Sequence, residues 1–140
     1  MATHRATLFA TQKQGDSMPV PPVRVLLVED EPLLSTLFGE VLESMGYVVC
    51  AIATTERDAV AAAVRCKPDV MLVDIQLAVG SGISAVAEIL RDGFVPHVFY
   101  SGDIAGIRAS RPSAVAIQKP FRIAELADAI ERALGASARA

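Results

Sequence analysis

Tryptophan is absent from this sequence and lysine is scarce, with only Lys13, Lys67 and Lys119 among thirteen basic residues. No apolar run is long enough to span a bilayer, so we expect no membrane partner. The net charge of -3 also argues against the basic face that nucleic-acid binders carry. These absences leave a globular protein that binds neither membrane nor nucleic acid as the expected class.

Cysteine is also rare, because Cys50 and Cys66 are the only two. Their spacing suggests neither a metal site nor a redox motif. We expect both to be free, buried thiols of a protein kept in a reducing cytoplasm. The beginning of the chain lacks the continuous apolar core of a signal peptide, which also favours a cytoplasmic location.

The composition predicts one folded domain with a proper core, since 52% of the 140 residues are apolar and 21% are charged. Residues 1–22 are polar and then proline-rich, and we expect a flexible tail there. The domain should cover residues 23–135, and residues 136–140 should form a short C-terminal tail. We expect no room for a second domain.

Short apolar runs alternate with segments of helical periodicity along the whole domain. The runs predict five strands, at residues 25–28, 47–52, 70–73, 95–100 and 115–118. Helices are predicted at about 32–45, 55–65, 84–91 and 123–134, with Gly135 just beyond the last. Residues 104–112 are predicted to form one or two helical turns or a loop.

This alternation predicts an α/β fold, a doubly wound parallel sheet with helices on both faces. The flavodoxin-like strand order 2-1-3-4-5 is the expected topology. In that order the first and third strands are neighbours, and ligands bind outside the carboxyl ends of the strands. The fourth helix, after the fourth strand, is expected to be short.

Charged and hydroxyl side chains follow the predicted strands at that edge. Glu29 and Asp30 follow the first strand, Asp74 the third, Ser101 the fourth and Lys119 the fifth. Three carboxylates in one place repel one another unless a counter-charge is present. Mg2+ prefers such oxygen ligands, and a lysine would add a second positive charge. An aspartate, bound Mg2+ and a lysine are the parts that phosphoryl transfer to a carboxylate needs.

In this arrangement the sequence resembles the receiver domains of two-component response regulators over residues 23–134. Any one matching piece is weak, whereas all of them in order, each at a strand end, form a specific pattern. The pieces are Val28-Glu29-Asp30-Glu31, Val73-Asp74, Leu77, Gly82, Ser101-Gly102 and Lys119-Pro120.

The resemblance implies an Mg2+ site. Asp74 would be the nucleophile that accepts a phosphoryl group from a phosphohistidine or a small phosphodonor. Asp30 would bind Mg2+ directly and Glu29 through water. Asp74 itself and the backbone carbonyl of Gln76 would complete the protein ligands.

The resemblance also implies roles for the last two strand ends. The hydroxyl of Ser101 would shift to meet the new phosphoryl oxygens. Lys119 would pair with Asp74 and then with the phosphoryl group. The peptide bond between Lys119 and Pro120 is expected to be cis, as in similar domains.

The sequence departs from the family pattern in three places. Ala78 stands where a proline is usual, and Ala116 stands where relatives carry a tyrosine or phenylalanine. The usual aromatic switch therefore cannot operate unchanged. The segment between Ser101 and Lys119 is also short, which resembles the alphaproteobacterial subgroup called the FAT GUY type. The run Phe99–Asp103 matches that subgroup's motif loosely.

Several of the charged and hydroxyl residues also have an ordinary structural interpretation. Glu31 suits a helix N-terminus, where the helix dipole favours acids. Ser101 could be a turn former before Gly102, and Lys119 a surface lysine. His97 is expected to be a strand residue and no ligand.

We therefore hypothesise a single-domain response regulator, not an enzyme, that is phosphorylated on Asp74 and signals through protein–protein contacts. Its partners would be a histidine kinase or phosphotransfer protein and a downstream protein, and it would be a monomer or weak dimer. One alternative is a pseudo-receiver that binds partners without being phosphorylated. Another is a small Mg2+-dependent phosphatase, although such enzymes usually carry a second acid where this chain has Gln76.

Overall fold

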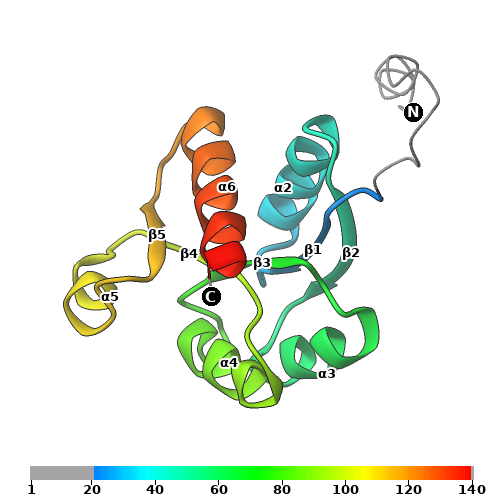
Figure 1. Cartoon of the computed structure of the whole chain (residues 1–140). Coiled ribbons are helices and arrows are strands. Elements are labelled where there is room, and N and C mark those ends of the chain that lie inside the picture. The colour runs from blue at the N-terminus through cyan, green and yellow to red at the C-terminus, as the bar shows by residue number, and fades with distance from the viewer. Residues whose placement is uncertain (1–20, 140) are drawn as a thin grey trace.

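The computed structural model describes residues 21–139, and these form a five-stranded parallel sheet in the order β2-β1-β3-β4-β5 (Figure 1). This confirms the predicted fold class and strand order. Residues 1–20, most of the predicted N-terminal tail, lie outside the described range. The elements are β1 (Arg24–Val28), α2 (Pro32–Ser44), β2 (Val48–Ala53), α3 (Glu56–Cys66), β3 (Val70–Asp74), α4 (Gly82–Ile89), the 3-10 helix η1 (Leu90–Asp92), β4 (His97–Ser101), α5 (Ala105–Ser110), β5 (Val115–Gln118) and α6 (Ile123–Arg139).

Helices cover both faces of the sheet, with α2 and α6 on one face and α3 and α4 on the other (Figure 1). Alternate side chains of each central strand therefore enter different cores. Met71 and Val73 of β3 pack toward α3 and α4, whereas Val70 and Leu72 pack toward α2 and α6. This is why β1 and β3 read as continuous apolar runs.

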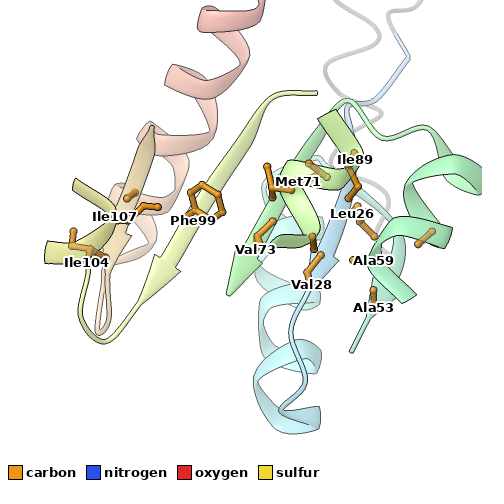
Figure 2. Close-up of a cluster of buried hydrophobic side chains, with 14 residues drawn as sticks. Leu26, Val28, Ala53, Ala59, Met71, Val73, Ile89, Phe99, Ile104 and Ile107 are labelled. Carbon is orange, nitrogen blue, oxygen red and sulfur yellow. The ribbon is translucent and has the colours of Figure 1, made fainter. Parts of the chain in front are cut away.

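The helix after β4 is short, as predicted, because α5 has only six residues. It lies beside β5 at the edge of the sheet (Figure 1). Ile107 from α5 and Ile104 just before it join Phe99 in the core cluster shown in Figure 2. Two apolar side chains thus anchor this helix to the sheet.

Hydroxyl caps fix where two of the helices begin. Thr55 precedes α3 and accepts a hydrogen bond from the Asp58 amide at 3.0 Å. Ser81 precedes α4 and accepts from the amides of Ile83 and Ser84, at 3.1 and 3.3 Å. The predicted start of α4 near Ser84 is therefore late, because Ser81 is the N-cap and Gly82 the first helical residue.

The last helix is longer than predicted. Gly135 does not end it, and α6 continues to Arg139, so the predicted C-terminal tail is helical apart from Ala140, which lies outside the described residues. A glycine inside a helix costs only about 1 kcal/mol relative to alanine. The alanines and arginine that follow are good helix formers, and they outweigh this cost.

The cysteine prediction was wrong. Cys50 of β2 and Cys66 at the end of α3 form a disulfide, with Cα atoms 6.2 Å apart, and both are partly exposed. The helix runs back along the strand that precedes it, so residues 16 positions apart come together. The cysteines therefore give no support for a reducing compartment. Within the described part of the chain, no helix is long and apolar enough to cross a membrane.

Candidate functional site

The three predicted acids meet at the carboxyl edge of the sheet. Glu29 and Asp30 directly follow β1, and Asp74 ends the neighbouring strand β3. One carboxylate oxygen from each lies within 4.8 Å of the others. Glu29 is 1% exposed and Asp74 3%, whereas Asp30 is only partly buried, so the cluster opens to water at Asp30.

Asp74 is held by two donors. The Lys119 ammonium lies 3.3 Å from Asp74 Oδ2, and the amide of Gln76 donates to Oδ1 at 3.0 Å. Lys119 therefore supplies the predicted positive charge beside the acids, and it is no ordinary surface lysine. The role of the Gln76 carbonyl as a ligand stays a prediction.

Asp30 is held by the loop after β3. The Ala78 amide donates to Asp30 Oδ2 at 2.6 Å. A proline at this position, usual in similar domains, has no N–H and could not make this bond. The departure at Ala78 thus adds a fixed donor to one of the predicted metal ligands.

Glu29 has a partner that the sequence analysis missed. The Tyr100 hydroxyl donates to Glu29 Oε1 at 2.5 Å, and the Glu31 amide donates to Oε2 at 3.0 Å. Burial raises the pKa of Glu29, although these two hydrogen bonds act in the opposite direction. Burial also raises the pKa of Tyr100, and so does its bond to Glu29, so Tyr100 stays a donor.

Ser101 ends β4 and is fully buried. Its Oγ accepts from the Asp103 amide at 3.1 Å, and its carbonyl accepts from the Lys119 amide at 2.8 Å. The first bond is the turn-forming role considered above, yet it leaves the hydroxyl proton free to donate elsewhere. The bond between Lys119 and Pro120 is cis, as predicted.

The donor set fits a hard divalent cation. Carboxylate oxygens are the ligands of Mg2+, whereas zinc sites favour histidine and cysteine. The cluster holds three acids, and Lys119 is the one basic side chain of residues 21–139 that forms an ion pair with it. A bound Mg2+ would supply the missing positive charge and orient phosphate oxygens there, with Glu29, Asp30 and Asp74 as the side chains that would hold it.

A surface hollow of about 500 Å³ is lined in part by Lys119. Ala116, the predicted departure from an aromatic residue, lines it, together with Ile104 from the loop before α5 and Arg132 from α6. His97 lies away from the acids, and its Nδ1 is 2.8 Å from the Val95 carbonyl. It therefore stays a strand residue.

Gly82 sets the first testable prediction. A Cβ at this position would collide with the Asp74 carbonyl oxygen and the Val73 side chain. Gly82→Ala should therefore displace the end of β3 and lower the free energy of unfolding by about 1–3 kcal/mol in urea denaturation. Gly106→Ala is the control, because a Cβ there meets nothing within 4 Å. Equal stability of the two variants would contradict the prediction.

Comparison with known proteins points in one direction. Residues 25–131 match the sequence model of the response regulator receiver domain. The chain is 37% identical over 114 residues to the phyllosphere-induced regulator PhyR of Methylorubrum extorquens, covering 79% of this chain and 43% of PhyR. It is 35% identical over 124 residues to the transcriptional regulatory protein PdtaR of Mycobacterium tuberculosis, covering 85% of this chain and 60% of PdtaR.

Solved structures agree. The PhyR receiver domain of Erythrobacter litoralis superposes with a TM-score of 0.73 at 32% identity, over 81% of this chain and 91% of that domain. PhyR of Brucella abortus gives a TM-score of 0.77 at 33% identity, over 96% of this chain and 56% of that protein. These relatives are consistent with the subgroup resemblance noted above. The chain spans about half the length of the full-length regulators it matches.

Proposed function

The chain belongs to the response regulator receiver family, and we propose that it works as a phosphorylated signalling switch with Asp74 as the acceptor. The observation that carries this proposal is the grouping of Asp74 with two further carboxylates and with Lys119 at 3.3 Å. Mg2+ bound by Glu29, Asp30 and Asp74, with the Gln76 carbonyl as a further ligand, would neutralise the acids.

The transfer needs this chain, Mg2+ and a phosphohistidine donor. A carboxylate oxygen of Asp74 attacks the phosphorus atom, an oxygen–phosphorus bond forms, and the phosphorus–nitrogen bond to the imidazole breaks. The electron pair of the broken bond stays with the leaving imidazole. Lys119, now 3.3 Å from Asp74, would pair with the phosphoryl charge, and the hydroxyl of Ser101 would donate to it.

The output would be a change of surface. Because Ala116 offers no aromatic ring, we propose that the moving part is the segment from Gly102 to Arg111, which includes the short helix α5. Phosphorylation would shift an existing equilibrium of the surface formed by β4, this segment, β5 and α6. A downstream protein would bind that surface, and a histidine kinase or phosphotransfer protein in the cytoplasm would supply the phosphoryl group. The domain would act as a monomer or weak dimer.

Intact-mass spectrometry tests the proposal. Incubation with a small acyl phosphate donor and Mg2+ should add one phosphoryl group, and removing Mg2+ with EDTA should slow the reaction by at least about tenfold, since the metal stabilises the transferred charge. A chain that binds Mg2+ without ever gaining mass would favour the pseudo-receiver alternative. NMR shifts around Asp74 on adding beryllofluoride would then indicate that Asp74 can be phosphorylated and that the phosphorylated form is hydrolysed too fast to detect.

The phosphatase alternative predicts something else. It requires repeated turnover, with steady release of inorganic phosphate from simple phosphate esters. The proposal predicts no such release. The measurement is phosphate production with the chain far below the ester concentration.

A further inference from the structure

The side chain of Tyr100 reaches from the hydrophobic core to the acidic cluster. It is fully buried near the end of β4 and lies opposite Asp74 in the parallel ladder. Its hydroxyl nevertheless reaches Glu29, which follows β1 on the far side of β3. Adjacent strands are about 4.8 Å apart, so only a long side chain can bridge from β4 to the end of β1.

The Tyr100 hydroxyl is the hydrogen-bond donor to one of the two carboxylate oxygens of Glu29. The Glu31 amide holds Oε2, and the Tyr100 hydroxyl holds Oε1, so the orientation of the carboxylate is fixed by two donors. A phenylalanine at position 100 would leave Oε1 without that donor. A buried carboxylate oxygen that loses its donor leaves the carboxylate free to rotate toward another partner.

The ring of Tyr100 also contacts the Lys119 ammonium group. Lys119 Nζ lies 5.1 Å from the ring centroid while it is 3.3 Å from Asp74 Oδ2. The face of an aromatic ring attracts an ammonium group at this separation. The ring is itself fixed edge-on against Phe38 of α2, at 5.2 Å between centroids, and against Phe121, at 6.1 Å.

We propose that Tyr100 is a positioning residue for the metal site, whose hydroxyl holds the Glu29 carboxylate in the orientation that Mg2+ binding requires. It acts through Glu29 and does not touch the reacting atoms. This inference rests on the proposed function, since it assumes that the cluster binds Mg2+.

The decisive variant is Tyr100→Phe, which removes the hydroxyl and keeps the ring. Outer hydrogen-bond partners of metal ligands typically contribute a factor of 10–100 to affinity, so calorimetric titration should show about tenfold weaker Mg2+ binding. The phosphorylation rate of the variant at saturating Mg2+ should stay within about threefold of the wild-type rate. At that concentration the metal site is full in both chains, so weaker Mg2+ binding no longer limits the reaction. Tyr47→Phe is the matched control, since Tyr47 is the other tyrosine, packs at the margin of the core and precedes β2, at the opposite edge of the sheet from Glu29, Asp30 and Asp74.

A double-variant cycle tests whether the effect passes through Glu29. Tyr100→Phe should weaken Mg2+ binding in the wild-type background and change it less than about twofold in the Glu29→Ala background, which has no acceptor for the Tyr100 hydroxyl. In the unmodified chain, NMR of labelled tyrosine rings should show the Tyr100 signals shifting on addition of Mg2+ while those of Tyr47 stay in place. This measurement needs no variant, so it holds even if Tyr100→Phe fails to fold.

The outcomes separate the two proposals. If the wild-type chain binds no Mg2+, the proposed metal-dependent function and this inference both fail. If the wild-type chain binds Mg2+ and the Mg2+ affinity of Tyr100→Phe is within twofold of the wild-type affinity, the inference alone is overturned. The same holds if Tyr100→Phe weakens binding equally in the Glu29→Ala background, or if the Tyr100 ring signals do not respond to Mg2+.

Discussion

Asp74→Asn is expected to gain no phosphoryl group under conditions that label the wild-type chain. Asn has nearly the same shape but offers no carboxylate oxygen to attack phosphorus. The substitution keeps an acceptor for only one of the two partners of Asp74, the Gln76 amide and Lys119. It also removes one of three mutually repelling acids, so we expect these effects to offset each other and the free energy of unfolding to change by less than about 1 kcal/mol.

The measurement is intact mass after incubation with a small acyl phosphate donor and Mg2+, with urea denaturation to show that the fold is kept. Asp92→Asn is the matched control, because Asp92 is exposed in η1 and outside the acidic cluster. It should be labelled as the wild type is. A labelled Asp74→Asn chain would mean that the acceptor is another residue.

The positions of these acids were predictable from the sequence because strand ends are local features. Val70 to Val73 form an apolar run closed by Asp74, and a parallel sheet brings such ends to one edge. The apolar periodicity therefore located both the strands and the site. The helix ends were less predictable, as α6 shows, because one glycine weighs against several helix formers beyond it.

Contacts between distant side chains could not be predicted in the same way. The Tyr100–Glu29 bond joins residues 71 positions apart, and the Cys50–Cys66 pair depends on how α3 lies against β2. The sequence does contain a signal for the Tyr100–Glu29 bond. A tyrosine directly before Ser101 places a long side chain with a hydroxyl donor at the carboxyl edge of the sheet, where the acids lie. The Ala78 bond to Asp30 is different, because the sequence shows an alanine where a proline is usual, and an alanine always has a backbone N–H to donate.

Lys119→Met should lower the phosphorylation rate at saturating Mg2+ by roughly a hundredfold. A fixed donor aimed at transition-state charge is typically worth a factor of 10²–10³ in rate. Lys119 is the only cation that contacts Asp74 in the described part of the chain, and its ammonium has no replacement in the variant. Methionine keeps the length of an unbranched side chain beside the Tyr100 ring, so the packing there is largely preserved. Lys67→Met is the control, because Lys67 is exposed at the other end of β3, after α3.

The same variant should bind Mg2+ more tightly, by about threefold or more, because a positive charge beside the metal site is removed. Tyr100→Phe should do the reverse, weakening Mg2+ binding while sparing the rate at saturation. Rates and calorimetric Mg2+ affinities of the two variants therefore separate the group that stabilises transferred charge from the group that positions a ligand. If Lys119→Met lost Mg2+ affinity and rate together, Lys119 would be holding the acidic cluster in shape, and its direct role in the transfer would be refuted.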